Sequence, residues 1–117
     1  CNEGSIWEAA MSASSLNLDN LTCVVDYNGF QSDGMTSNII NQENLADRWS
    51  SFGWEVIQID GHSFSEIEKS FKTNLQIDKP KLILARTVKG KGVDFMENNN
   101  NWHQPQVASS DKSKLLN

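Results

Sequence analysis

The stretch Val24–Gly34, VVDYNGFQSDG, joins an apolar run to two turn signals that follow one another closely. The run belongs to Leu21–Tyr27, LTCVVDY, whose β-branched and apolar centre predicts a strand buried on both faces. The pair Asn28-Gly29 has two interpretations. It is the preferred dipeptide of a tight hairpin turn, or it ends a strand in a loop that holds a ligand. The flanks VVDY and FQSDG do not form two matched alternating strands, which weakens the hairpin interpretation.

Helical and extended patterns alternate on both sides of this stretch. We expect helices at Ser5–Ser15, Gln42–Phe52 and Phe64–Thr73, strands at Leu21–Tyr27, Trp54–Ile59 and Lys81–Val88, and a long polar loop at Gly29–Asn41. The alternation predicts an α/β fold, in which a parallel sheet carries helices on both faces. Ligands in such sheets bind beyond the carboxyl ends of the strands. The segments predicted to lie there are Tyr27–Gly34, Asp60–Ser63 and Lys89–His103.

The predicted helices have recognisable ends and inner faces. Ser5 is expected to cap the first helix, with Glu8 completing a capping box. Ser63 is expected to cap the third helix, and Gly53 ends the second. The residues predicted to face inward are Ile6, Ala9, Ala10 and Ala13 in the first helix, Leu45, Trp49 and Phe52 in the second, and Phe64, Ile67 and Phe71 in the third.

Composition limits the classes of partner. The 10 Lys and Arg against 15 Asp and Glu give a net charge of −5, so we expect no nucleic-acid partner, which would need a basic surface. No apolar run is long enough to cross a membrane, and no membrane is expected as a partner. Cys1 and Cys23 have no metal-binding spacing, and a reduced, buried Cys23 favours a cytoplasmic location. The four tryptophans predict large buried side chains or an extensive interface.

Asn28 follows a strand that is predicted to be central. Its amide oxygen is a neutral hard ligand that suits Mg²⁺ or Ca²⁺. Gly29 lets the backbone turn so sharply that a following carbonyl faces the same point. Two glutamates, Glu3 and Glu8, flank the start of the first helix, where carboxylates are usually caps or partners of the helix dipole; a buried acid network is the alternative.

The two histidines, His62 and His103, both fall in loops predicted at the carboxyl ends of strands. A pair of histidines on one sheet edge suggests a site without specifying its chemistry. The sequence KGKG at 89–92 is predicted to be a solvated basic turn, because a phosphate-binding loop of the Walker type needs another spacing and a following helix.

Four segments of the chain together resemble one family. They are EGSIWEAAMSA (3–13), NLTCVVDYNGFQSDG (20–34), WEVIQIDGH (54–62) and KPKLILARTVKGKGVDFMENNNNWH (79–103), which are similar to the transketolases in order and spacing. The match runs from about Asn2 to His103. It looks most like the thiamine-diphosphate-binding N-terminal section that forms a separate subunit in split bacterial transketolases.

The resemblance implies that the loop after the first strand is a clamp for a metal and a diphosphate. Asn28 matches an asparagine whose side chain ligates Mg²⁺, and Phe30 matches a position whose backbone carbonyl also ligates the metal. Gly29 lies between them, and Ser32 matches the segment that passes the thiazolium end of the cofactor. The implied cofactors are therefore thiamine diphosphate and Mg²⁺.

Three further residues acquire catalytic roles by resemblance. His103 matches a family histidine near the diphosphate and the substrate. Glu3 and Glu8 match two glutamates that are linked to a proton network between paired active sites, which favours the functional interpretation of these residues over capping. His62 matches a recurrent Asp-Gly-His turn that we interpret as structural.

The implied activity is the transfer of a two-carbon ketol unit between sugar phosphates. The Gly-Asp-Gly that begins the family's cofactor motif is absent, and Cys1 falls just after its place, so we expect the chain to be a piece of a longer protein. Residues 1–104 would be the C-terminal half of a thiamine diphosphate-binding domain, and 105–117 a polar tail. A pyrimidine-binding domain or a C-terminal transketolase subunit would complete the site in a homodimer or heterotetramer, so we expect no activity from this chain alone.

Two alternatives stay open. The alpha subunits of 2-oxo acid dehydrogenases and the deoxyxylulose-phosphate synthases share this topology, although the SDG that follows the asparagine favours transketolase. The second alternative is a non-catalytic interaction domain that kept the fold and lost the cofactor. The absent Gly-Asp-Gly supports this alternative.

Overall fold

The computed structural model describes residues 1–117 except 74–77, 105–106, 109–110 and 113–117. Of the tail predicted at 105–117, it therefore describes only 107–108 and 111–112, and the rest lies outside the described residues. The elements are α1 (Gly4–Ser15), β1 (Thr22–Tyr27), β2 (Phe30–Gln31), β3 (Gly34–Met35), α2 (Thr36–Ile39), α3 (Leu45–Ser51), β4 (Glu55–Asp60), α4 (Phe64–Lys72), β5 (Lys81–Arg86) and the 3₁₀ helix η1 (Asn100–Trp102).

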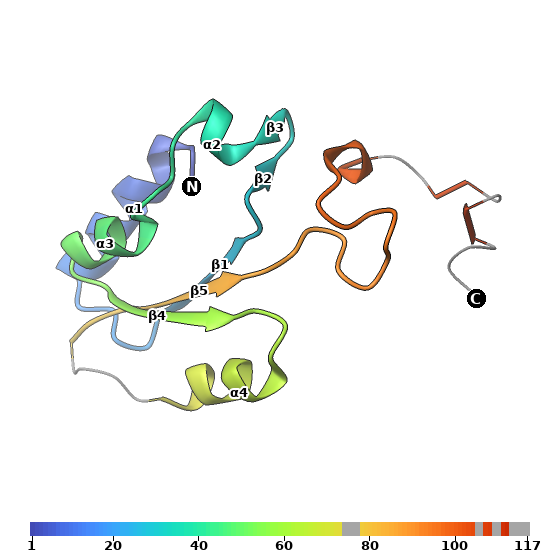
Figure 1. Ribbon diagram of the computed structural model, residues 1–117. Coiled ribbons are helices and arrows are strands. Elements are labelled where there is room, and N and C mark those ends of the chain that lie inside the picture. The colour runs from blue at the N-terminus through green and yellow to red at the C-terminus, as the bar shows by residue number, and fades with distance from the viewer. Residues whose placement is uncertain (74–77, 105–106, 109–110, 113–117) are drawn as a thin grey trace.

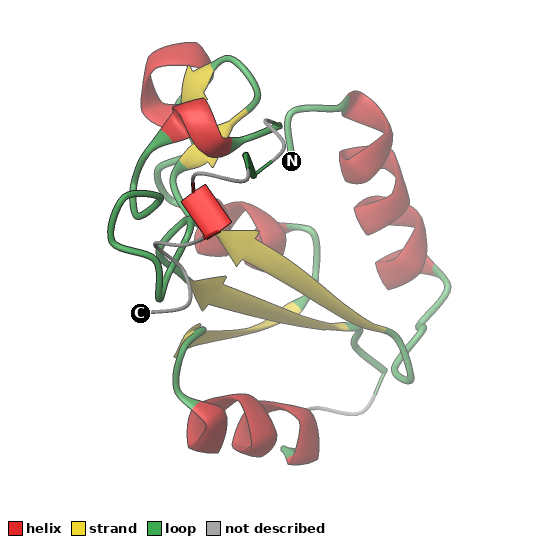
Figure 2. Cartoon of the chain, turned by 90° about the vertical axis from the view of Figure 1, so that its right-hand side faces the viewer, coloured by secondary structure: helices red, strands yellow, loops and turns green. Residues whose placement is uncertain are grey.

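A parallel sheet in the order β1-β5-β4 forms the middle layer (Figure 1). The last strand in sequence, β5, is central because its residues Leu82, Ile83, Leu84 and Ala85 are all buried and apolar, as a strand covered on both faces requires. Ile83 pairs with Val24 of β1 on one side and with Ile57 of β4 on the other. Helices cover both faces, which confirms the predicted α/β class (Figure 2).

The larger core lies between the sheet and the two helices α1 and α3. Its buried residues are Ala10, Ala13, Leu45, Trp49, Trp54, Leu82 and Leu84. The small alanines let α1 approach the tryptophans closely, and the indole N–H of Trp54 donates to the Ala10 carbonyl at 2.9 Å. The rings of Trp49 and Trp54 meet edge to face at 4.8 Å. This packing fixes α1, whose first turn begins at the sheet edge discussed below.

The opposite face is covered by α4, but not with the residues predicted. Ile67 packs against Ile59, Ile83 and Ala85 as expected. Phe64 and Phe71 are 88% and 54% exposed, so their predicted inward orientation is wrong. The buried Ser70 lies on the inner face instead, and its hydroxyl donates to the Ile67 carbonyl, which satisfies the buried polar group.

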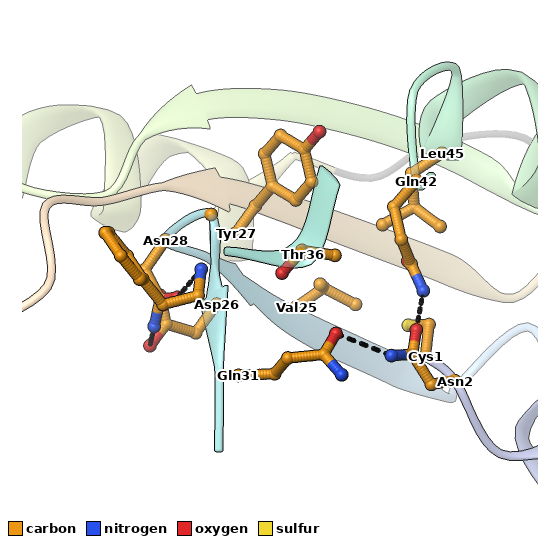
Figure 3. Close-up of a pocket in the computed structure, with 12 residues that line it drawn as sticks. Cys1, Asn2, Val25, Asp26, Tyr27, Asn28, Gln31, Thr36, Gln42 and Leu45 are labelled. Atoms are coloured by element: carbon orange, nitrogen blue, oxygen red, sulfur yellow. Dashed lines mark hydrogen bonds between the residues drawn. The ribbon is translucent and has the colours of Figure 1, made fainter. Parts of the chain in front are cut away.

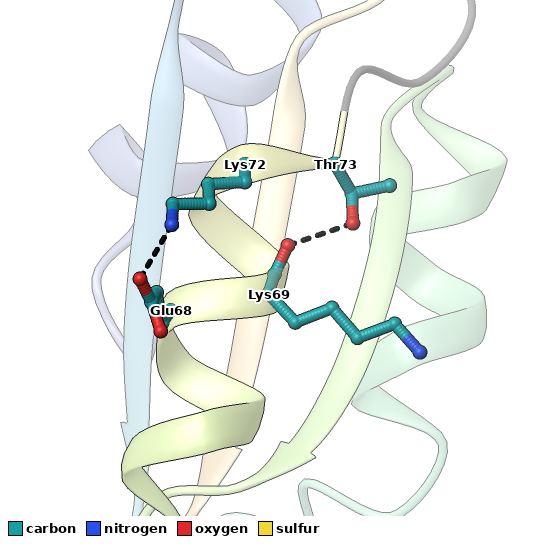
Figure 4. Close-up of polar contacts among 4 residues, drawn as sticks. All are labelled: Glu68, Lys69, Lys72 and Thr73. Carbon is teal, nitrogen blue, oxygen red and sulfur yellow. Dashed lines mark hydrogen bonds and ion pairs between the residues drawn. The ribbon is translucent and has the colours of Figure 1, made fainter.

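The end of α4 is held from the sheet. The Lys81 ammonium at the start of β5 donates to the carbonyls of Ser70, Phe71 and Thr73 at 3.1, 3.1 and 3.3 Å. These are carbonyls that a helix end leaves without intrahelical partners. Figure 4 shows two local contacts in the same turn, the ion pair between Lys72 and Glu68 and the hydrogen bond from the Thr73 hydroxyl to the Lys69 carbonyl at 2.7 Å.

Several predicted helix ends are shifted. The N-cap of α1 is Glu3, without a side-chain cap, so the capping box predicted from Ser5 and Glu8 does not form. The helix predicted at Gln42–Phe52 begins only at Leu45, because Asn44 has a left-handed backbone with φ 60°. Gly53 does end it, at φ +87°, and Ser63 caps α4 as predicted by accepting from the Glu66 N–H.

The strand β1 and the segment after it also differ from expectation. Val24 is 52% exposed, because α4 lies over β4 and β5, and the opposite face of β1 is only half-buried. Cys23 is half-buried rather than buried. The loop predicted at Gly29–Asn41 contains a short hairpin, in which Phe30 pairs with Met35, followed by the single turn of α2.

Across the described part of the chain, the helices are all too short or too polar to span a membrane.

Candidate functional site

The three predicted strand ends meet at one edge of the sheet, as parallel pairing requires. Tyr27 at the end of β1 and Asp60 at the end of β4 both pair with Arg86 at the end of β5. The segments that follow are joined by backbone hydrogen bonds. The Gly61 N–H donates to the Arg86 carbonyl at 2.7 Å, and the Thr87 N–H donates to the Tyr27 carbonyl at 3.4 Å.

A pocket of about 270 Å³ opens at the end of β1 (Figure 3). Its walls come from the residues before α1, from the end of β1 with the hairpin, and from the residues around the start of α3. The lining residues are Cys1, Asn2, Val25, Asp26, Tyr27, Asn28, Gly29, Phe30, Gln31, Thr36, Gln42 and Leu45. Three of the predicted cofactor-binding residues, Asn28, Gly29 and Phe30, are therefore brought together in one cavity.

The Asn28 side chain has a fixed orientation in this pocket. Its Oδ1 accepts the Phe30 backbone N–H at 2.9 Å, and its Nδ2 donates to Asp26 Oδ2 at 3.2 Å. Gly29 has φ +78°, a conformation in which glycine carries no Cβ penalty. The turn of the hairpin is at Ser32-Asp33, after β2. The Asn28-Gly29 pair is therefore not the hairpin turn of the first interpretation.

A chain of amides closes the other side of the pocket (Figure 3). Asn2 donates from Nδ2 to Gln31 Oε1 at 2.6 Å, and its Oδ1 accepts from Gln42 Nε2. Gln42 is only 6% exposed, so this hydrogen bond satisfies a buried donor. The chain ties the segment before α1 to the hairpin and to the approach to α3.

The residues of the pocket fit part of a Mg²⁺ site. Asn28 Oδ1 accepts a single hydrogen bond in the structure, and an amide oxygen has two lone pairs, so one is left for a metal. Amide and carbonyl oxygens are the neutral ligands that hard cations accept. Among the described residues, no three His, Cys, Asp or Glu side chains gather into a metal-binding group. Asn28 and Phe30 could therefore contribute two neutral oxygen ligands to such a site.

The predicted residues Ser32 and His103 do not line the pocket: Ser32 lies at the turn of the hairpin, and His103 follows η1. Asn100 of η1 donates from Nδ2 to the Ser32 carbonyl at 3.2 Å, which fixes the segment before His103 against the hairpin. The His103 ring is exposed, and its Nδ1 lies 3.2 Å from the Lys89 ammonium. Because an ammonium only donates, this contact is a hydrogen bond when Nδ1 is the acceptor.

The loop that carries His103 is closed by its own contacts. The Asn98 N–H donates to the Lys89 carbonyl at 2.9 Å. Glu97 accepts from the Gly92 N–H at 3.0 Å, and this backbone hydrogen bond, together with Lys91, holds the pKa of Glu97 below its usual value. The rings of Phe95 and Trp102 pack at 5.3 Å. The predicted solvated basic turn is thus the start of a compact loop.

The remaining candidate residues do not line the pocket. Glu3 and Glu8 are exposed at the first half of α1. His62 accepts the Val88 N–H at Nε2 over 2.8 Å, so it joins the turn after β4 to the segment after β5. Burial raises the pKa of the Cys23 thiol, which lies inside β1.

Sequence reasoning missed several residues of the site. Asp26 had a usable signal, because residues two apart on a strand point to the same side, and Asn28 follows it by two. Asn2 and Gln42 had none, since they are 40 positions apart and Gln42 appeared to begin a helix. Asn100 sat within the run of four asparagines, in which no single residue is distinguished.

Comparisons with known proteins agree on one family. The family model described as "Transketolase, thiamine diphosphate binding domain" matches residues 1–115. One of the subunits of the apulose-4-phosphate transketolase of Phocaeicola vulgatus is 40% identical over 102 residues, which are 86% of this chain and 36% of that protein. The 6-deoxy-6-sulfo-D-fructose transketolase subunit SqwG of Clostridium sp. is 46% identical over 97 residues, 82% of this chain and 35% of that protein.

The fold comparison points the same way. A transketolase crystal structure from Campylobacter jejuni superposes with a TM-score of 0.78 at 33% identity, covering 85% of this chain and 16% of that one. The chain spans about a third of the length of the curated relatives named above.

Proposed function

The chain belongs to the transketolase family, within its thiamine diphosphate binding domain, and on this basis we propose that it supplies part of the active site of a transketolase. The reaction would transfer a two-carbon ketol unit between sugar phosphates. The observation that supports the proposal is the pocket at the end of β1, which Asn28, Gly29 and Phe30 line and in which Asn28 Oδ1 accepts the Phe30 N–H.

In this proposal Asn28 and Phe30 hold Mg²⁺, and the metal holds the diphosphate of thiamine diphosphate. Thiamine diphosphate, when bound, supplies the carbanion chemistry that protein side chains lack. Gly29 keeps the loop turned so that the Asn28 side chain and the Phe30 carbonyl serve one metal. Ser32 follows on the same hairpin, toward the reactive end of the cofactor.

His103 would act on the substrate side of the site. Lys89 contacts Nδ1, so Nε2 is the ring nitrogen left to bind a substrate oxygen or the diphosphate. Glu3 and Glu8 would belong to a proton network shared between paired active sites. Their exposure on α1 suits residues that face another protein chain.

A partner is part of the proposal. Asn28 and Phe30 would supply only two of the oxygen ligands that Mg²⁺ needs, so further ligands are expected from the diphosphate and from a partner. The relatives above are named as subunits of transketolases. We infer that a pyrimidine-binding domain, or a separate C-terminal transketolase subunit, completes the site in a homodimer or heterotetramer in the cytoplasm.

The test is a two-carbon transfer assay on the protein assembled with its partner. Activity from a ketose phosphate donor to an aldose phosphate acceptor is expected to require thiamine diphosphate and Mg²⁺. Asn28→Ala is expected to raise the Mg²⁺ concentration needed for half-maximal activity at least about tenfold. Mutating a residue that only hydrogen-bonds to a metal ligand already lowers metal affinity by about tenfold or more, and Asn28 would be a ligand itself. Asn38→Ala, at an exposed asparagine of α2, is the matched control and should behave as wild type.

Two results would contradict the proposal. Turnover of 2-oxo acids without ketol transfer would place the protein with another class of thiamine diphosphate enzymes. Assembly with the partner but no cofactor-dependent turnover of either substrate class would support a non-catalytic domain that kept the fold.

A further inference from the structure

We propose that Asp26 and Thr87 are positioning residues that hold the Asn28 amide with its oxygen presented to the metal; this inference rests on the function proposed above. Neither residue is a metal ligand in this account. They act through Asn28, from the ends of two neighbouring strands, β1 and β5.

The orientation of the Asn28 amide is set from both of its ends (Figure 3). Nδ2 donates to Asp26 Oδ2 at 3.2 Å, while Oδ1 accepts from the Phe30 N–H at 2.9 Å. Turning the amide by half a rotation would place its hydrogens against the Phe30 N–H and its oxygen against a carboxylate. Both contacts would be repulsive, so Asp26 and the Phe30 backbone together select one orientation.

Asp26 is held in turn by Thr87. The second carboxylate oxygen, Oδ1, accepts from the Thr87 hydroxyl. The Thr87 backbone N–H also donates to the Tyr27 carbonyl, which keeps the residue beside the end of β1. Each oxygen of Asp26 therefore has one donor, and the carboxylate has little freedom to rotate away from Asn28.

The Thr87 hydroxyl faces Asp26 because its methyl group has another contact. A Cβ built at Gly61 would overlap the Thr87 Cγ2 and would lie 3.0 Å from the Arg86 carbonyl oxygen. The glycine after β4 thus leaves room for the Thr87 methyl and directs the hydroxyl to the opposite side. A series of contacts therefore joins the three strand ends. It runs from Gly61 after β4 to Thr87 after β5, then to Asp26 in β1 and on to Asn28.

The geometry distinguishes positioning from ligation. Asp26 lies at the amide nitrogen of Asn28, which is the end away from the ligating oxygen. Residues that hydrogen-bond to a ligand from behind typically change metal affinity about 10–100-fold when they are removed. An acceptor at this position is what matters, so the charge of Asp26 is dispensable while its hydrogen bonds are not.

The experiment measures Mn²⁺ binding by electron paramagnetic resonance on the protein assembled with its partner, at saturating thiamine diphosphate. Asp26→Ala is expected to weaken Mn²⁺ binding about 10–100-fold, and Thr87→Val by a smaller factor in the same direction. Asp26→Asn is the matched control, because its oxygen still accepts from Asn28 and its amide can donate to the Thr87 hydroxyl. It is expected to stay within about threefold of wild type, as is Thr87→Ser.

Unfolding by urea without metal gives a second readout. The midpoints of all four variants are expected to match wild type, since Asp26 is exposed and Thr87 half-buried. A loss of Mn²⁺ affinity that only follows a lowered midpoint would mean a structural role, and the inference would be overturned.

The outcomes separate this inference from the proposed function. If Asp26→Asn loses as much affinity as Asp26→Ala, Asp26 is a ligand or a charge partner of the metal and not a positioning residue. If Asn28→Ala binds Mn²⁺ poorly while Asp26→Ala and Thr87→Val bind it normally, the positioning role is wrong and the proposed function stands. If the wild-type assembly does not bind Mn²⁺ with thiamine diphosphate, the proposed function fails and this inference fails with it.

Discussion

Replacing Trp54 by Phe should cost much more stability than the same replacement of Trp49. Both indoles are buried in one cluster, at 5% and 3% exposure, and their rings are in contact. The two N–H groups differ. Trp54 Nε1 donates to the Ala10 carbonyl at 2.9 Å, whereas Trp49 Nε1 is buried and has no partner among the described residues.

The magnitude follows from this difference. Both variants lose the same part of an indole ring, so the cost of the smaller ring largely cancels between them. Trp54→Phe also loses a hydrogen bond with a net value of about 1 kcal/mol, while Trp49→Phe removes an unsatisfied donor that costs about 1–3 kcal/mol in the native protein. The free energy of unfolding should therefore be lower for Trp54→Phe than for Trp49→Phe by roughly 2 kcal/mol or more.

Urea unfolding followed by circular dichroism is the suitable assay, because removing tryptophans changes the fluorescence signal. The two variants should share one m-value and differ in midpoint. Equal midpoints, or a lower midpoint for Trp49→Phe, would mean that the Trp54–Ala10 hydrogen bond does not stabilise the protein. The bond that joins α1 to the sheet would then contribute nothing, and the position of α1 beside the pocket would need another cause.

Three further predictions concern α4, the His103 loop and the thiols. Lys81→Met should lower the free energy of unfolding by about 1–2 kcal/mol, because the ammonium that binds the last carbonyls of α4 is lost. Lys69→Met, on the exposed side of α4, is the control and should leave the free energy of unfolding near that of wild type. Glu97→Gln should be less stable than wild type at neutral pH. Because a backbone N–H lowers the pKa of Glu97 from its usual 4.5, that difference should shrink as the pH falls below about 4.5, which acid-to-neutral unfolding series would show. Iodoacetamide at pH 8 should alkylate the exposed Cys1 well before Cys23, whose pKa burial raises; equal rates by mass spectrometry would show that β1 opens readily.

The order of elements could be predicted because each has a strong local signal. The buried run Leu82–Ala85 predicts a central strand without any knowledge of its neighbours. The Ser63 cap likewise needs only residues within one turn of α4.

The inner face of α4 could not be predicted in the same way. Phe64, Ile67 and Phe71 have helical spacing, but which part of that stripe is buried depends on how far the sheet extends beneath the helix. Only Ile67 lies over β4 and β5. The predicted start of α3 was wrong for a related reason. Nothing in the sequence distinguishes the left-handed Asn44 from an asparagine inside a helix.

At the candidate site, the loop was predictable and its support was not. Asn28 and Gly29 stand out because they follow a strong strand pattern. Thr87 and Asn2 take part through contacts across 61 and 40 positions of sequence, and such contacts become visible only when the strands and the segment before α1 are in place.

The most direct test of the central claim is a calorimetric titration of thiamine diphosphate, with and without Mg²⁺. The samples are the protein alone, its partner alone and the two together. Tight binding is expected only when both are mixed in the presence of Mg²⁺, and weakened binding when the mixture contains Asn28→Ala. Binding that is equally tight without Mg²⁺, or no binding to the mixture at all, would contradict the claim that the loop after β1 holds a metal and a diphosphate.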